Sequence, residues 1–292
     1  MRKERILIWI YEVCQIIKEY IGRSCSFGCA YKKMNKTYVN RILKDTDYVR
    51  CGGTEEEKKA AQYLIDRCAD FGVEAHMESF EIQMAYIKVD KLYADGKEIP
   101  CKAYKNCGSV DLTADFVYAP DLTDVTLNSV KDKIVLLDGG IPYNTYQDLY
   151  EHGAKGFICW VGNVNYRDND IDQRELRPHV SMGKIIPGAC INAKDAFSLV
   201  KDKTKEIHMV IEQDEYMGAS QNVVAEIPGT TDEWIVFTAH YDSTSLSHGA
   251  YDNMTGCIGL LGIMEAMKME NNIVLEILIM MVLCYVVMGL HL

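Results

Sequence analysis

Positive charge, proline and tryptophan are all scarce in this sequence. Lys and Arg total 31 against 42 Asp and Glu, and the 292 residues include only 6 Pro and 3 Trp. The net charge of −11 disfavours a nucleic-acid backbone or an anionic membrane surface as the main partner, whereas a cationic ligand or a carboxylate metal site fits it better. With 48% hydrophobic and 25% charged residues, collagen-like, low-complexity and largely disordered chains are excluded.

Three common catalytic signatures are also missing. The sequence contains no Gly-x-Ser-x-Gly elbow, no phosphate-binding P-loop and no Gly-x-Gly-x-x-Gly fingerprint. Each of these motifs places a nucleophile or a phosphate at a tight turn that needs glycine. Their absence makes a serine hydrolase, a nucleotidase or a dehydrogenase less favoured as the function of this chain.

The cysteines do not form an evident disulfide framework. There are 11 of them, an odd and scattered set, so we expect reduced thiols in a reducing compartment and a cytoplasmic location. Cys25 and Cys29, or Cys101 and Cys107, lack a second pair at zinc-site spacing. The basic start is followed by an apolar run of only six residues at 6–11, which favours an amphipathic first helix over a signal peptide.

The first part of the chain predicts a helix followed by a strand. Thr54 and Glu57 form a capping box, and Gly72 supplies the stop of an amphipathic helix that begins at Glu55. We interpret the acidic run 55–57 as a solvated helix start that complements the helix dipole, without a catalytic role. Residues 73–78 alternate between apolar and polar side chains, which is typical of a half-buried strand.

The middle and final parts differ in pattern. Between about 85 and 215 the apolar runs are short, and the runs at 134–137 and 157–161 flank a helix-like stretch at 145–152, which predicts a small βαβ unit. From about 220 the runs are longer: strands at 222–227 and 234–239 precede a helix near 253–269. We therefore expect an α/β fold with a mainly parallel sheet covered by helices.

The chemistry concentrates where the second of those long strands ends. His240 and Asp242 leave the carboxyl end of an apolar strand, and Asp252 precedes the next helix on a Gly-rich turn. Ligands of open α/β sheets bind at that edge. A His nitrogen can bind a divalent metal while a carboxylate two positions on accepts the other ring N–H, and a second carboxylate can bridge two ions. This donor set favours zinc. Taken alone, His-x-Asp is more often a hydrogen-bonded surface pair.

The whole constellation resembles a known family. The segment 238–256, with the strand 220–229 before it, is similar to the metal-binding core of the di-zinc aminopeptidases, metallopeptidase family twenty-eight. The resemblance implies that His240 binds one zinc, that Asp252 bridges two zinc ions, and that Asp242 orients His240 as a catalytic residue. No other cofactor is implied. The implied substrate is a peptide, shortened at its amino terminus by metal-assisted hydrolysis.

The resemblance also implies a domain organisation. Residues 1–84, which include the motif Arg50-Cys-Gly-Gly-Thr54, resemble the amino-terminal helical part of the peptidase domain. Residues 85–215 resemble a small β-rich protease-associated insert, chiefly at 130–135 and 153–158, and residues 216–292 the first part of the zinc-exopeptidase α/β core. We thus expect an incomplete zinc-exopeptidase fold.

One departure from the family bears on activity. Family members carry a Glu-Glu pair about 34 residues beyond the bridging Asp, followed by x-Gly-Leu, and this frame falls here on Val286-Val287-Met-Gly-Leu. The chain also ends at Leu292, before further family ligands, so we expect a truncated member without aminopeptidase turnover. The alternative is a non-catalytic interaction module of the same fold.

Two expectations concern the last residues and possible partners. An incomplete parallel sheet leaves an open edge, which predicts poor solubility, a homo-oligomer or a partner chain that covers it. The stretch 273–292 contains one Glu and one His and is long enough to span a bilayer. Glu276 and the lack of flanking Lys or Arg favour a buried central strand over a membrane-spanning segment.

Overall fold

The chain folds into two compact units, which are described separately. The computed structural model describes residues 34–164, 170–231, 234–268 and 276–282. Unit 1 comprises residues 1–82 and 219–292, and unit 2 comprises residues 83–218. These boundaries separate two units, each of which is defined by the contacts among its own residues. The assignment of the middle part as a protease-associated insert stays a prediction.

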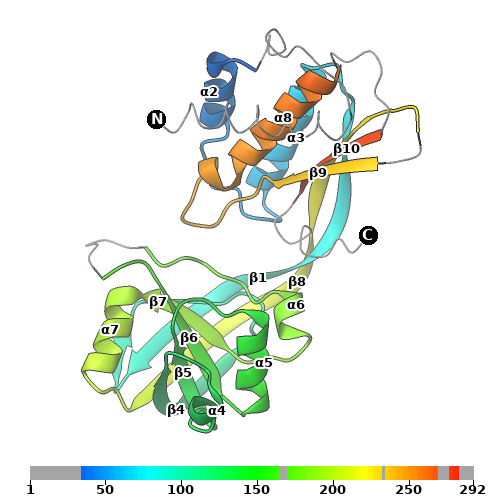
Figure 1. Cartoon of the computed structure of the whole chain (residues 1–292). Helices are drawn as coiled ribbons and strands as arrows, with labels where there is room; N and C mark the ends of the chain where they lie inside the picture. The colour runs from blue at the N-terminus through cyan, green and yellow to red at the C-terminus, as the bar shows by residue number, and fades with distance from the viewer. Residues whose placement is uncertain (1–33, 165–169, 232–233, 269–275, 283–292) are drawn as a thin grey trace. The chain divides into compact units, whose positions relative to one another are not determined.

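Unit 1 is built from helices and the ends of long strands (Figure 1). Its helices are α2 (Lys36–Asp45), α3 (Glu55–Ala69), a short π-helical turn η2 (Ala250–Met254) and α8 (Thr255–Lys268). Its strands are β9 (Trp234–His240), β10 (Glu276–Val282) and parts of β1 (Ala75–Ala94) and β8 (Glu206–Ile227). Strand β10 lies between β8, which is antiparallel to it, and β9, which is parallel.

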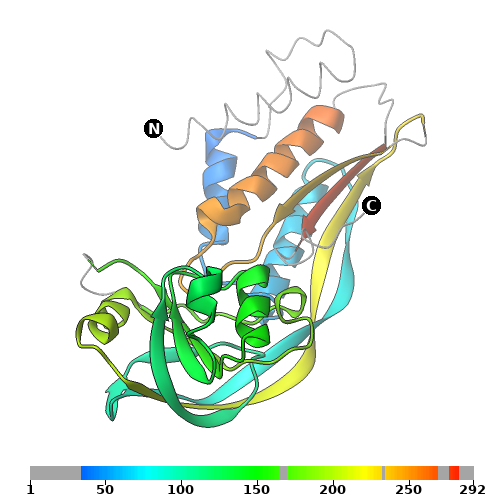
Figure 2. The same ribbon diagram turned by 60° about the horizontal axis from the view of Figure 1, so that its bottom comes forward.

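Helix α8 forms the centre of the unit 1 core. The sequence predicted an amphipathic stripe on this helix, but every residue from Cys257 to Met267 is buried. The helix packs against β9, α2 and α3 and so has no solvent face to keep polar (Figure 2). The sheet residues Val223, Ala239 and Ile279 join the same core.

Unit 2 contains the predicted βαβ unit. Its further strands are β2 (Lys97–Ile99), β3 (Cys101–Ala103), β4 (Val110–Ala119), β5 (Lys133–Leu137), β6 (Gly156–Val161) and β7 (Gly188–Asn192). Its helices are α4 (Asp124–Leu127), α5 (Tyr143–Glu151), α6 (Pro178–Ser181) and α7 (Ala193–Lys201). Strands β4, β5, β6 and β7 pair in parallel, whereas β3 and β8 pair antiparallel with β7 and β4. The predicted α/β class is confirmed, with parallel pairs in both units.

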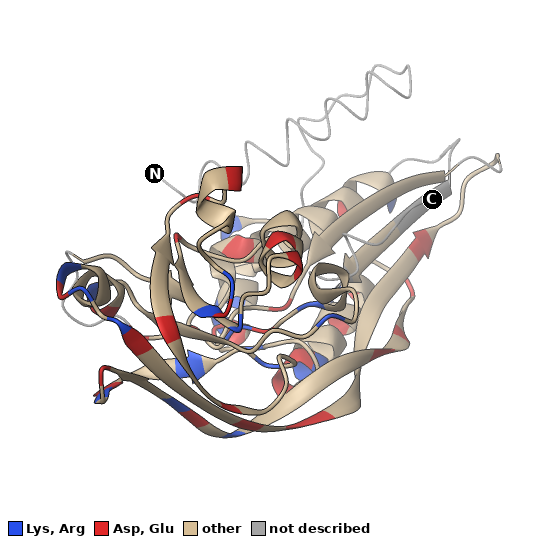
Figure 3. Ribbon diagram, turned by 90° about the horizontal axis from the view of Figure 1, so that it is seen from below, with Lys and Arg blue, Asp and Glu red and all other residues tan. Residues whose placement is uncertain are grey.

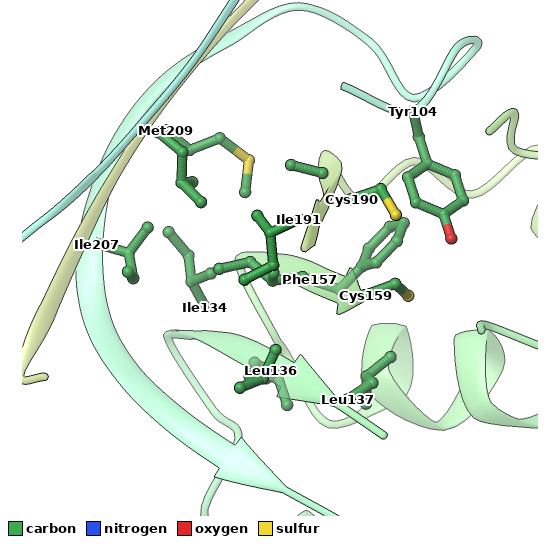
Figure 4. Packing of buried hydrophobic residues seen from close by; sticks show 14 of the residues in the cluster. Tyr104, Ile134, Leu136, Leu137, Phe157, Cys159, Cys190, Ile191, Ile207 and Met209 are labelled. Carbon is green, nitrogen blue, oxygen red and sulfur yellow. The ribbon is translucent and has the colours of Figure 1, made fainter. Parts of the chain in front are cut away.

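Apolar strand residues and aromatic rings fill the core of unit 2 (Figure 4). Phe157 on β6 is fully buried and packs edge-to-face on Tyr104 and Tyr146, with ring centroids 5.0 and 6.0 Å apart. Charged residues of both signs are mixed along the ribbon of both units (Figure 3). An example is Lys88, whose Nζ lies 2.7 Å from Asp214 Oδ1.

Two expectations about the end of the chain can be compared with the structure. The predicted final strand is present as β10, whereas residues 283–292 and the expected first helix lie outside the described residues. No helix within the described ranges is both long and apolar enough to cross a bilayer. Among the described strands, β9 pairs only with β10, so the expectation of a covering partner stays a prediction.

The packing around Phe157 generates a testable prediction. A Cβ added at Gly188 would lie 2.1 Å from Phe157 Cζ, and the ring is held by Tyr104 and Tyr146. Gly188→Ala should therefore destabilise unit 2 by about 1–3 kcal/mol, the usual cost of overpacking a core. Chemical denaturation measures this loss, with Ser198→Ala on the exposed side of α7 expected to stay within about 0.5 kcal/mol of the parent chain. Equal stabilities of the two variants would contradict the tight packing.

Candidate metal centre

The three predicted site residues lie together at the carboxyl end of β9. His240 is the last residue of the strand, and Asp242 follows in the loop. His240 Nδ1 lies 3.0 Å from Asp242 Oδ1, and His240 Nε2 lies 2.8 Å from Asp252 Oδ1. The imidazole is thus bracketed by two carboxylates.

The two carboxylates have different surroundings. The side chain of Asp242 is 12% exposed, whereas that of Asp252 is 80% exposed. The pKa of His240 is raised, chiefly by the hydrogen bond to Asp242 and further by Asp252, while burial opposes the shift. The buried Asp242 carboxylate orients the ring through Nδ1, and the accessible Asp252 carboxylate lies at Nε2. This arrangement can direct Nε2 and Asp252 towards a shared cation.

The turn that carries Asp252 is held by its neighbours. Asp252 and Asn253 have non-helical backbone angles within η2, and the peptide bond between them is cis. Asn253 Oδ1 accepts a hydrogen bond of 3.2 Å from the Gly256 N–H at the start of α8. A Cβ at Gly256 would lie 2.6 Å from the Asn253 amide, so glycine is required for this approach.

Arg50 lies beneath the loop that joins His240 to Asp252. Its side chain is fully buried, and the guanidinium donates to the backbone carbonyls of Tyr241, His248 and Gly249. The motif Arg50-Cys-Gly-Gly-Thr54 resembles a family segment, but the sequence does not assign the Arg50 side chain a role. A surface arginine and one that crosses to a segment 191 residues away look alike in a sequence.

Glu57 corrects the prediction of a solvated acidic helix start. Glu55 and Glu56 are exposed, but Glu57 is fully buried, and burial raises its pKa. Glu57 Oε1 accepts hydrogen bonds from Ser220 Oγ at 2.6 Å and from Tyr241 Oη at 3.2 Å.

The capping box is present in altered form. The Thr54 hydroxyl accepts from the Glu57 N–H, as predicted, but the Glu57 carboxylate accepts from Gly53 N–H at 2.7 Å rather than from Thr54. The carboxylate that caps the helix is therefore the same one that contacts Tyr241, the residue next to His240.

The donor set tests whether zinc fits this site. An imidazole nitrogen and a carboxylate are ligands that zinc uses, and a catalytic zinc has three protein ligands. Within residues 34–164, 170–231, 234–268 and 276–282, no three His, Cys, Asp or Glu side chains gather in a metal-binding group. The described residues therefore provide two donors of the right kind and do not form a complete catalytic zinc site.

Two other positions singled out in the sequence lie elsewhere. His248, in the loop between the candidate ligands, is exposed and its Nδ1 lies 2.8 Å from Asp47 Oδ1. It does not join His240 and Asp252. Val286 and Val287, where the family frame places its Glu-Glu pair, lie outside the described residues.

Comparison with known proteins identifies the segment that contains this site. Residues 222–284 match the model of peptidase family M28. The segment is thus similar to family M28 over 63 of the 292 residues. It includes β9, β10, α8 and all three candidate site residues, whereas Arg50 and Glu57 lie outside the match. No curated protein matches the chain.

Solved structures share the fold. A zinc aminopeptidase from Bacillus subtilis, BSAP, superposes with a TM-score of 0.66 at 20% identity, covering 87% of this chain and 62% of its own. An aminopeptidase from Aneurinibacillus sp. strain AM-1 gives 0.64 at 17% identity, covering 87% and 63%. A peptidase M28 precursor from Shewanella amazonensis SB2B gives 0.56 at 21% identity, covering 83% and 62%. This chain thus spans less than two thirds of each of these structures, and at these identities the likeness concerns the fold.

Gly249 provides a test of the loop between His240 and Asp252. It has φ +56°, and a Cβ there would lie 2.8 Å from Arg50 Nη2 and 2.9 Å from Ser243 Cβ. Gly72 has φ +69° with nothing within 4 Å, so Gly72→Ala should cost only the left-handed backbone penalty of about 1–2 kcal/mol. Gly249→Ala should cost a further 1–3 kcal/mol or so from the clash, measured by urea denaturation. Equal costs for both variants would mean that the loop and Arg50 are not closely packed.

Proposed function

We propose that this chain supplies part of the catalytic domain of a zinc-dependent aminopeptidase, which removes amino-terminal residues from peptides. The observation that carries the proposal is the bracketed imidazole, with His240 between Asp242 and Asp252 at the carboxyl end of β9, inside the family M28 segment. Two of the structural neighbours are aminopeptidases, which supports it.

The residues of the site have distinct tasks under this proposal. His240 Nε2 and the exposed Asp252 carboxylate would hold the metal, which the family resemblance implies to be zinc. Asp242 accepts the Nδ1–H of His240, which places the free electron pair on Nε2, where a metal can use it. Bound zinc supplies Lewis acidity that polarises a carbonyl and lowers the pKa of a bound water to about 7.

We further propose that the chain with this sequence has no aminopeptidase turnover of its own. The two protein donors found among the described residues are fewer than the three of a catalytic zinc site. Valines stand at 286 and 287 in the frame where the family has its general base, and loss of a general base lowers rates by roughly 10²–10⁴. A cytoplasmic location and a partner chain over the open sheet edge remain part of this proposal.

The second candidate is a non-catalytic interaction module of the same fold. It is favoured by the lack of any three-residue metal-binding group in the described ranges. The two candidates differ in whether the His240 and Asp252 positions bind zinc at all.

Zinc titration of the full chain tests the proposal. We expect calorimetry to detect zinc binding to the parent chain, and His240→Ala and Asp252→Asn each to weaken it at least tenfold, because each removes one of two donors. Asp242→Asn, which removes only the orienting acceptor, should weaken binding about 10–100-fold. His208→Ala is the matched control, since His208 Nε2 also lies 2.7 Å from a carboxylate, that of Asp111, in unit 2.

The outcomes separate the two candidates. Zinc binding that His208→Ala preserves and His240→Ala abolishes supports the metal site. No zinc binding to the parent chain, or equal binding by all variants, supports the interaction module. Zinc-dependent release of a chromophore from an aminoacyl anilide by the parent chain would contradict the proposed lack of turnover.

A further inference from the structure

We propose that Arg50 is a positioning residue of the candidate metal centre, because its buried guanidinium binds both ends of the loop that separates His240 from Asp252. The inference rests on the proposed function in one respect: the loop matters because its two ends carry the proposed metal donors. The positioning itself is a property of the metal-free chain.

The contacts of Arg50 reach both ends of that loop. Nε donates to the carbonyl of Tyr241, the residue after His240, and Nη2 donates to the carbonyl of Gly249 at 2.9 Å, three residues before Asp252. One rigid guanidinium plane therefore sets the separation between the end of β9 and the start of η2. Because His240 lies one residue before Tyr241 and Asp252 three residues after Gly249, that separation influences how His240 faces Asp252.

The backbone of Arg50 adds a second connection. The Arg50 N–H donates to Ser243 Oγ at 2.9 Å, and the Ser243 N–H donates to the Arg50 carbonyl at 3.1 Å. Ser243 follows Asp242, so the segment that carries the orienting carboxylate is tied to the same residue. Both hydrogen bonds join the loop to the backbone around Arg50 and do not involve the guanidinium.

The remaining guanidinium nitrogen, Nη1, joins the residues just before Arg50 to the loop. Nη1 donates to the carbonyls of Thr46 and Tyr48 at 3.0 and 3.2 Å, and also to that of His248. Arginine carries five N–H donors in one plane, whereas the lysine ammonium is a compact point charge with three. This set of carbonyls therefore specifies arginine.

The burial of this cation argues for a positional task. Arg50 is 0% exposed, and removing a charge from water costs free energy that only good hydrogen bonding offsets. An apolar side chain of similar volume could fill the same space without that cost, but it could not hold carbonyls at fixed positions.

The side chain of Tyr241 is held from a different direction. Tyr241 Oη donates to the Gln221 carbonyl at 2.6 Å and contacts Glu57 Oε1 at 3.2 Å. Glu57 in turn accepts from Ser220 Oγ on β8. The residue next to His240 thus has its carbonyl bound by Arg50 and its side chain bound by α3 and β8, so its position is specified twice.

The experiment compares Arg50→Met and Arg50→Lys with the parent full chain, without metal and with zinc. Nitrogen-15 NMR of labelled histidine reports the tautomer and hydrogen bonding of His240, assigned with His240→Ala. Hydrogen exchange reports protection of amides 243–256. We expect Arg50→Met to shift the His240 ring signals, to lower loop protection at least tenfold and to weaken zinc binding about 10–100-fold. Arg50→Lys should restore part of each effect.

Leu64→Ala is the matched control. Leu64 is fully buried on α3 in the core of unit 1, so its truncation lowers the melting temperature while every hydrogen bond of Arg50 keeps its partner. His240 signals that move in Arg50→Met and stay in place in Leu64→Ala support positioning. A folded Arg50→Met chain with parent-like His240 signals and loop protection overturns it.

Gly249→Ala decides the matter if neither Arg50 variant folds. A Cβ at this position would lie 2.8 Å from Arg50 Nη2 and would displace the guanidinium from the loop. Reduced loop protection with shifted His240 signals supports the inference, and unchanged values overturn it. If the parent chain binds no zinc but its His240 signals respond to Arg50→Met, the proposed function fails while the positioning role stands. If zinc binding and the His240 signals are both unchanged in Arg50→Met, the positioning role fails while the proposed function stands.

Discussion

The candidate site depends on one imidazole held between two carboxylates where a strand ends. The orientation of the His240 ring is restrained, because Nδ1 contacts the nearly buried Asp242 and Nε2 contacts the exposed Asp252. The strand that carries it is fixed by its parallel partner β10 and by α8, which is buried on all sides. The function proposed for unit 1 depends on how well the segment between 240 and 252 keeps that geometry.

The restraints on that segment come from parts of the chain far away in sequence. Arg50 and Glu57 belong to the region before and at the start of α3, outside the family M28 match at 222–284. They bind the backbone and the side chain of Tyr241 through separate hydrogen bonds. The candidate metal-binding residues are thus close together in sequence, whereas the residues that hold them in place are not, and a fragment limited to residues 222–284 would lack those contacts.

Much of the fold could be predicted from the sequence, because hydrophobic period and capping are local signals. The βαβ unit of β5, α5 and β6, the helix after Asp252 and the α/β class all followed from such patterns. Glu57 and the full burial of α8 did not, since both depend on tertiary neighbours that composition does not reveal. An acidic residue at a helix start is normally solvated, and only the approach of Ser220 and Tyr241 makes Glu57 an exception.

The central claim is that His240 and Asp252 face one cation position. Anomalous diffraction at the zinc absorption edge, from crystals of the full chain grown with zinc, tests it most directly. We expect a zinc peak between His240 Nε2 and the Asp252 carboxylate, with Asp242 still hydrogen-bonded to His240 Nδ1. Ordered His240 and Asp252 side chains with the zinc peak elsewhere, or with no peak between them, would contradict it.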